Sequence, residues 1–147
     1  MGTQTQTEER VRSSTSSSQN EKIDRETKAN LARFKDLDSG AIRERLKELD
    51  KKWDIERTLM FNAATISLTG AMLAIFVNRK WAIMPAVVTS FLIQHTLQGW
   101  CPPLPLFRAM GIKSRQELDR EKYALKALRG DFKHVNDIDK AWKAVTK

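Results

Sequence analysis

Cysteine, histidine and glycine are scarce in this chain of 147 residues, which has one, two and six of them. The single cysteine, Cys101, excludes an intramolecular disulfide and a cysteine-rich metal site. The two histidines, His95 and His134, are far apart, and no glycine-rich loop is present. The sequence therefore contains no recognisable metal, phosphate or catalytic motif, and we expect no enzyme activity and no cofactor.

Charge is absent from two neighbouring stretches, although charged residues make up 30% of the chain. Residues 59–77 and 81–107 contain no Asp, Glu, Lys or Arg, and only residues 78–80 separate them. The first run has 19 residues, which as a helix gives about 28 Å, close to the thickness of a bilayer core. The pair predicts a transmembrane helical hairpin over 58–101, with spans at 59–77 and 81–101.

The alternative is a hairpin buried inside a soluble helical bundle. Buried helices of soluble proteins normally keep a polar stripe, and these two runs do not. The rest of the sequence also has too little apolar surface to enclose two fully apolar helices. We therefore favour the membrane hairpin and predict an all-α, integral membrane protein.

The flanking regions are polar or amphipathic. Residues 1–20 are rich in Ser, Thr and Gln and are predicted to be disordered. Residues 21–57 predict cytoplasmic amphipathic helices with a cap at Asp38, and residues 102–147 predict a proline-rich interfacial exit followed by cytoplasmic helices. Asn136 or Asp137 is expected to cap the last of these helices.

An apolar stripe precedes the first run. Ile42, Leu46, Leu49 and Trp53 recur at helical spacing, and no helix breaker follows before Val77. This pattern predicts a helix that continues without interruption into the membrane.

The net charge of +8 is distributed unevenly. Residues 1–57 hold 13 basic and 12 acidic groups, residues 108–147 hold 11 and 6, and the turn between the runs holds two basic groups. Basic residues concentrate in cytoplasmic loops, so we predict a multi-pass membrane protein with both termini in the cytoplasm. Attraction to anionic lipid headgroups explains the excess more simply than binding to nucleic acid.

Tryptophans stand at the ends of the two runs. We predict that Trp53 and Trp100 lie at the cytoplasmic interface and Trp81 at the outer one, because the indole ring favours the headgroup region.

Four other positions are candidates for function. Asn62, His95 and Gln98 are polar residues within apolar runs, and such residues mark either interhelical hydrogen bonds or a transport path. We favour hydrogen bonds between the helices, in which threonines such as Thr65 and Thr69 could also take part. Cys101 is expected at a helix C-terminus, where the helix dipole disfavours a reactive thiolate.

Small residues recur every four positions in both runs, as in Ala63, Ser67 and Ala71. This spacing lets helix backbones approach closely, either within the hairpin or between two copies of the chain. It is the basis for expecting a homo-oligomer or a subunit of a membrane complex.

The end of the second run carries a short motif. Gly99-Trp100-Cys101-Pro102 is followed by Leu104, Leu106, Arg108 and Met110-Gly111-Ile112. After a two-helix hairpin, this motif resembles the YgaP-like inner-membrane domain, a bacterial family whose hairpin ends in Gly-x-Cys-Pro. The resemblance covers roughly residues 55–113.

This resemblance implies an inner-membrane hairpin that self-associates, with Cys101 at the family's cysteine position. In some members a rhodanese sulfurtransferase domain precedes the hairpin. Here the N-terminal region is too short and too charged for that domain and has no catalytic cysteine loop, so sulfur transfer does not carry over.

The sequence therefore favours a non-enzymatic membrane anchor or scaffold that self-associates or binds a partner through its helices. Two other functions stay open. One is a small oligomeric transporter or channel lined by Asn62, His95 and Gln98, and the other is thiol or persulfide chemistry at Cys101.

Overall fold

The computed structural model describes residues 10–146, and over this range the chain is helical and contains no strand. The all-α prediction is confirmed. After a helical turn at residues 10–13, the elements are α2 (Ser17–Lys35), α3 (Ser39–Lys51), α4 (Ile55–Phe76), the 3-10 helix η1 (Arg79–Ala82), α5 (Ile83–Gln98), α6 (Leu104–Ala109), α7 (Arg115–Arg129) and α8 (Ile138–Thr146).

The chain divides into two compact units. Unit 1 contains the described residues up to Glu21 together with Trp53–Arg115, and so includes α4, η1, α5 and α6. Unit 2 contains Lys22–Lys52 and the described residues from Gln116 onward, and so includes most of α2 together with α3, most of α7 and α8. The membrane runs predicted from the sequence all belong to unit 1.

The predicted disordered tail is ordered where the structure describes it. Residues 10–13 form a helical turn, Val11 and Thr15 are buried, and α2 already begins at Ser17. The Nδ2 atom of Asn20 donates to the carbonyl oxygen of Arg12 at 2.8 Å, which fixes the turn between these two segments. Within residues 10–20 the structure therefore has helix at 10–13 and from Ser17 onward where disorder was predicted, while residues 1–9 lie outside the described residues.

The predicted continuous helix is interrupted before the first apolar run. α3 ends at Lys51 and α4 begins at Ile55, with extended backbone at Lys52 and Asp54. The carboxylate of Asp54 accepts a hydrogen bond from the backbone N–H of Arg57 at 2.7 Å. An aspartate in this position caps a helix start, so the local chemistry of Asp54 begins a new helix where the apolar pattern alone predicted continuity.

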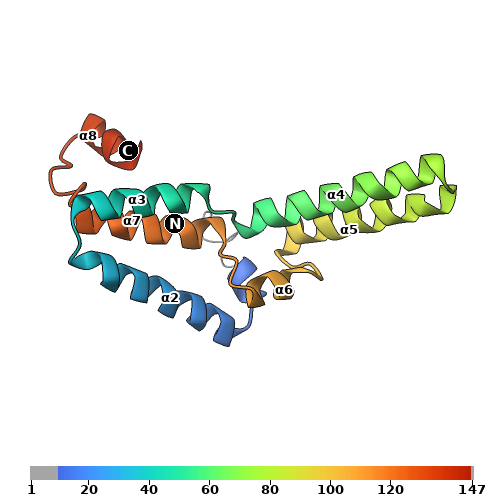
Figure 1. Ribbon diagram of the computed structural model, residues 1–147, viewed down its shortest axis with the longest axis horizontal. Helices are drawn as coiled ribbons and strands as arrows, with labels where there is room; N and C mark the ends of the chain where they lie inside the picture. Colours follow the sequence, from blue (N-terminus) through green and yellow to red (C-terminus); the bar gives the residue numbers. More distant parts are fainter. Residues whose placement is uncertain (1–9, 147) are drawn as a thin grey trace. The chain divides into compact units, whose positions relative to one another are not determined.

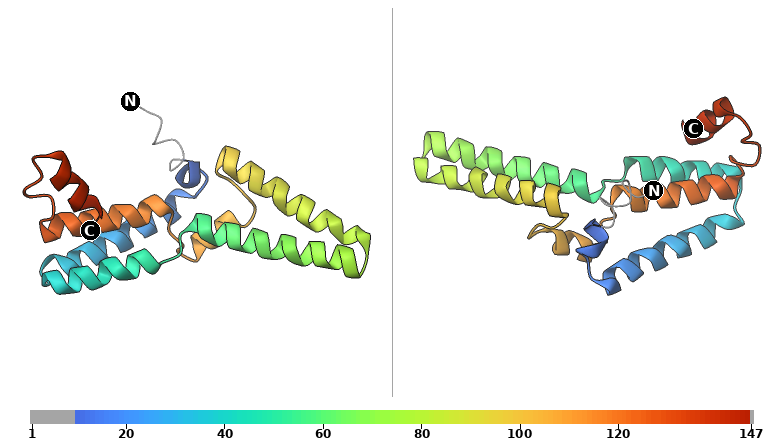
Figure 2. Two further views of the ribbon diagram at one scale, coloured as in Figure 1. Left: turned by 90° about the horizontal axis from the view of Figure 1, so that it is seen from above. Right: turned by 180° about the vertical axis from the view of Figure 1, so that it is seen from behind.

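α4 and α5 run antiparallel and side by side, as Figures 1 and 2 show from three directions. Asn78 makes the turn, since its side chain accepts from the N–H of Lys80 at 2.9 Å and its carbonyl from Trp81 at 3.0 Å. The two helices approach each other closely at Gly70, where an added Cβ would lie 2.8 Å from Cδ of Pro85 and 2.9 Å from Cβ of Met84. Gly70 thus takes the place that small residues occupy between closely packed helices.

One apolar segment within Ser39–Phe76 is long and apolar enough, among the described residues, to cross a membrane, and only 11% of that segment is buried. We predicted two such segments. α5 has 16 residues and is preceded by the four residues of η1, so the second run divides between two helices. The low burial of the first segment is unlike the core helix of a soluble protein.

Unit 2 buries a conventional apolar core. Ile42, Leu46 and Leu49 of α3 pack with Leu118 and Leu125 of α7, and Leu31 and Phe34 of α2 lie against this cluster. The caps predicted for this unit are present: the Asp38 carboxylate accepts from Ala41 N–H at 3.1 Å, and the Asp137 carboxylate accepts from Lys140 N–H at 2.8 Å.

A buried ion pair joins the three helices of this core. Glu121 of α7 is fully buried, and its Oε1 accepts from Nη2 of Arg45 at 2.8 Å and from Nδ2 of Asn30 at 3.3 Å. Burial alone would lower the pKa of Arg45, but its hydrogen bonds to Glu121 and Glu48 outweigh that effect and raise the pKa above its ordinary value. The Arg45 guanidinium is therefore held in its charged form by its acidic partners.

We predict that Gly70→Leu destabilises the α4–α5 hairpin by about 1–3 kcal/mol, because the added side chain overpacks against Met84 and Pro85. Ala64→Leu is the matched control, since Ala64 is an exposed residue of the same helix. The measurement is the thermal unfolding midpoint of the full chain in a mild detergent. Equal midpoints for the two variants would contradict close packing at Gly70.

We also predict that Glu121→Ala destabilises unit 2 by about 3 kcal/mol, because it leaves the Arg45 charge without its buried partner. The control is Glu44→Ala, which removes the exposed ion pair to Lys47 and is expected to have little effect on stability. Urea unfolding followed by circular dichroism distinguishes the two. A loss at Glu121 no larger than that at Glu44 would show that the buried pair contributes little.

Candidate functional site

A cavity of about 420 Å³ lies between α4, α5 and the chain that follows α5. Each of the three segments contributes four lining residues. α4 provides Leu59, Asn62, Ala63 and Ile66; α5 provides Val88, Phe91, Leu92 and His95; and the exit segment provides Cys101, Pro102, Pro103 and Phe107. The positions on α4 and α5 are three or four residues apart, so each helix presents one face to the cavity.

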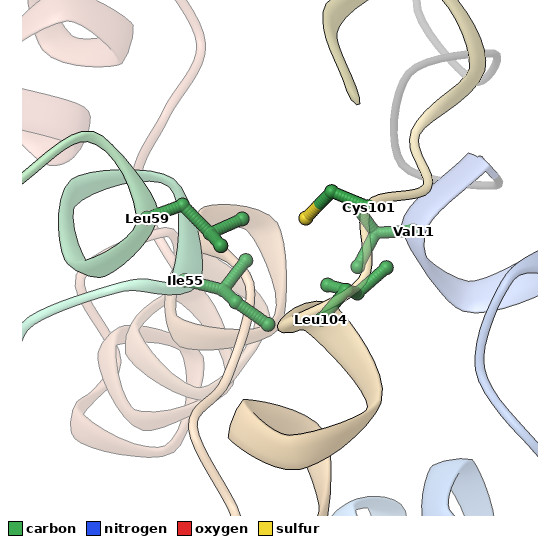
Figure 3. Packing of buried hydrophobic residues seen from close by; sticks show 5 residues of the cluster. All are labelled: Val11, Ile55, Leu59, Cys101 and Leu104. Carbon is green, nitrogen blue, oxygen red and sulfur yellow. The ribbon is translucent and has the colours of Figure 1, made fainter. Parts of the chain in front are cut away.

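The floor of the cavity is an apolar cluster. Val11, Ile55, Leu59, Cys101 and Leu104 are all buried, and Phe107 and Ile112 pack against them. Figure 3 shows Ile55 and Leu59 pointing from α4 toward Cys101 and Leu104, with the sulfur of Cys101 directed toward α4. Leu59 and Cys101 belong to both the cluster and the cavity wall, so the packing of the cluster fixes the shape of the cavity.

The turn after α5 brings the exit segment back beneath the hairpin. Gly99 ends α5 with φ +74°, in the left-handed region, and its N–H donates to the carbonyl of His95 at 2.7 Å. An added Cβ at Gly99 would lie only 2.5 Å from Cβ of Arg10, whose Nη1 donates to the carbonyl of Leu97 at 3.3 Å. Both the backbone conformation and this close approach require glycine here.

Three of the four predicted functional positions meet in the cavity, and the fourth does not. Asn62, His95 and Cys101 line it, whereas Gln98 is the exposed last residue of α5 and is not among its lining residues. Cys101 is only 4% exposed, as expected for an unreactive thiol. Nδ1 of His95 is buried and has no hydrogen-bond partner among the described residues.

We predicted hydrogen bonds between the two helices, but the described side chains of Asn62 and the threonines bond within their own helix. The side chains of Asn62, Thr65 and Thr69 donate to carbonyl oxygens four residues earlier in α4, at 2.8 Å each. Thr96 likewise donates to Leu92 within α5, at 2.9 Å. In an apolar helix the nearest unused acceptor is a backbone carbonyl of the preceding turn, and these short side chains reach it without a partner helix.

The three tryptophans lie partly exposed at the helix ends. Trp53 precedes α4, Trp81 lies in η1 and Trp100 follows Gly99, and each ring is about 40% exposed. The guanidinium carbon of Arg57 lies 4.5 Å from the ring centre of Trp53. Rings exposed at the ends of an apolar hairpin match the arrangement expected of interfacial anchors.

Arg108 is the residue whose position the sequence analysis missed. The sequence analysis counted it among the 11 basic groups of residues 108–147, but it is 1% exposed in α6. Its Nη2 donates to Oδ1 of Asn20 at 2.9 Å and its Nη1 donates to the carbonyl of Ile112 at 3.3 Å. Arg108 therefore positions α6 below the cavity. Its place in the motif resembling the YgaP-like domain was the one sequence signal that set it apart from other basic residues.

Comparison of two glycine variants is expected to separate backbone strain from crowding at the exit turn. Gly111 also has positive φ (+79°), but nothing lies within 4 Å of an added Cβ, whereas Gly99 meets Arg10. Gly111→Ala should cost about 1–2 kcal/mol through left-handed strain alone, and Gly99→Ala should cost more. Thermal unfolding in detergent measures both. A smaller loss for Gly99→Ala would contradict the packing of Arg10 against the turn.

The site can bind by apolar contact and a few hydrogen bonds, since no Asp, Glu, Lys or Arg is among the described residues that line the cavity. No group of three or more His, Cys, Asp or Glu in the described part of the chain could hold a metal ion. The sequence matches no protein family profile and no curated protein, and no solved structure matches it.

Proposed function

We propose that this chain is a non-enzymatic integral membrane protein in which α4 and η1–α5 cross the bacterial inner membrane as a hairpin. Unit 2 then forms a cytoplasmic helical module that binds a partner or a second copy of the chain. The observation that carries the proposal is the exposed apolar surface of α4, of which Ile75 and Phe76 are about three-quarters exposed. An exposed apolar surface of this extent favours a lipid or protein environment over water.

The lengths of the helices support two spans. The 22 residues of α4 extend about 33 Å. The 16 residues of α5 and the four of η1 together extend about 32 Å. The length of α4 and the combined length of η1 and α5 are both close to the thickness of a bilayer core, about 30 Å. The basic residues outside the hairpin favour a cytoplasmic location for both termini.

The last helix supports contact with a membrane surface. Ile138, Trp142 and Val145 of α8 are exposed on one face, while Lys140 and Lys143 lie on the same short helix. The Nζ atom of Lys126 donates to the carbonyl oxygen of Val145 at 2.9 Å, which holds the end of α8 to α7. A short helix with an apolar face and lysines suits a bilayer with anionic headgroups.

Two other functions were left open by the sequence, and neither has an observation in its favour. Gln98 lies outside the cavity that Asn62 and His95 share, so the three residues do not form one polar path within this chain. Cys101 is buried against Leu59 and Leu104, and chemistry at its sulfur would require this cluster to open. The resemblance to the YgaP-like domain supports a hairpin that self-associates, and this stays a proposal.

Single-cysteine labelling in intact bacteria tests the topology. In a Cys101→Ala background, Asn78→Cys is expected to react with a membrane-impermeant maleimide from outside, because Asn78 forms the turn between the spans. Lys140→Cys should react only after the membrane is permeabilised. Labelling of Lys140→Cys from outside would indicate one span, and release of the protein by alkaline carbonate would indicate none.

A further inference from the structure

The cavity has the dimensions and walls of a site for a lipophilic molecule. Its volume of about 420 Å³ lies within the range of about 300–1,000 Å³ typical of small-molecule sites. Nine of its twelve lining residues are apolar aliphatic, aromatic or proline side chains. Ile66 and Phe91 line it and are themselves more than a third exposed, so the cavity is open to the environment of the hairpin.

His95 gives this cavity a hydrogen-bond donor. Its Nδ1 is buried without a partner, whereas Nε2 is accessible and has no hydrogen bond within the described residues. A buried N–H without an acceptor is rarer and more costly than an unused acceptor. The proton of the neutral ring therefore belongs on Nε2. A molecule in the cavity that carries an acceptor, such as a carbonyl oxygen, would satisfy this donor.

The other two polar residues do not compete for the same role. The amide nitrogen of Asn62 donates one of its two hydrogens to the carbonyl of Thr58 at 2.8 Å, which holds the amide against its own helix. Cys101 is a weak donor within the apolar floor. His95 is thus the group that would orient a ligand.

The depth of His95 points to the class of ligand. His95 lies one turn before the end of α5 at Gly99, and Trp100 follows directly. Tryptophans favour the headgroup level of a bilayer, so one turn further in is the boundary between headgroups and hydrocarbon. At this boundary phospholipids carry their ester carbonyls, with the acyl chains continuing inward.

We propose that the cavity holds one acyl chain of a phospholipid and that the ester carbonyl of this chain accepts a hydrogen bond from Nε2–H of His95. The inference rests on the proposed function, because it requires the hairpin to lie in a bilayer. It assigns to the site a bound structural lipid that packs between α4, α5 and the exit segment.

The test compares two lipids that differ in one group. The full chain is purified and placed in nanodiscs made of equal amounts of diacyl phosphatidylglycerol and its dialkyl-ether analogue, which lacks the ester carbonyls. Native mass spectrometry after release from the nanodisc counts the lipids that stay bound. We expect one lipid per chain, with the ester form favoured about fivefold over the ether form, as one net hydrogen bond would give.

Three variants identify the donor. His95→Phe should abolish the preference for the ester lipid, and His95→Gln should retain it, because the glutamine amide places an N–H near the position of Nε2. Thr96→Val is the matched control on the neighbouring residue, whose hydroxyl donates to its own helix and which does not line the cavity. Ala63→Leu should reduce retention of both lipids by filling the space.

Several results would overturn the proposal. Equal retention of ester and ether lipid by the wild-type chain would do so even if His95→Phe failed to fold, and so would an unchanged preference in a folded His95→Phe. Displacement of the phospholipid by equimolar decylubiquinone would assign the cavity to a different lipophile. If the cysteine labelling supports two spans and no lipid preference appears, only this inference fails; if the labelling itself fails, both proposals do.

Discussion

The chain reversal at Gly99 is the constraint on which the arrangement of unit 1 depends. Its left-handed backbone ends α5 and directs the following residues beneath the hairpin, so that Cys101 and Leu104 pack against Ile55 and Leu59. Without this turn only α4 and α5 would line the cavity, because the exit segment would not return to the hairpin. The close approach of Arg10 to the same glycine adds the N-terminal segment to the structure, so three distant parts of the sequence fix one another.

The two units place their apolar residues in different ways. Unit 2 follows the rule for proteins in water, with apolar stripes of α2, α3 and α7 turned toward a common core and a buried ion pair satisfied on several sides. In unit 1, α4 and α5 pack closely through Gly70 but leave most of their apolar side chains uncovered. Scattered apolar residues are common on soluble surfaces, whereas continuous exposure along a helix is not. This contrast within one chain is the physical basis of the proposal that the hairpin lies in a membrane.

Local features of the fold could be predicted from the sequence, and contacts between distant residues could not. Apolar periodicity and capping residues located α3 and α8, because Asp38 and Asp137 act on amides only a few residues away. The same signals failed where a local and a long-range effect compete. Asp54 interrupts a helix that the apolar pattern continued, and residues 10–20 are ordered by burial of Val11, which their polar composition did not suggest.

The candidate site was predictable by residue and not by arrangement. Polarity within an apolar run singled out Asn62 and His95, and the Gly-x-Cys-Pro motif singled out Cys101, but a linear pattern does not specify which of them face one cavity. Gln98 met the same criterion and lies outside, because the helix ends there and its side chain is exposed. Arg108 was read as a surface charge because its partners, Asn20 and Ile112, become visible only when α6 folds back.

The hydrogen bonds of the hairpin explain why His95 differs from its polar neighbours. Serine, threonine and asparagine have side chains short enough to bond the preceding turn of their own helix, as Asn62, Ser90 and Thr96 do. Such residues are satisfied in any apolar environment and demand no ligand or partner helix. An imidazole is longer and rigid, and here one of its nitrogens is buried while the other is accessible. Among the described polar residues that line the cavity, His95 is therefore the one with a buried nitrogen that no hydrogen bond satisfies.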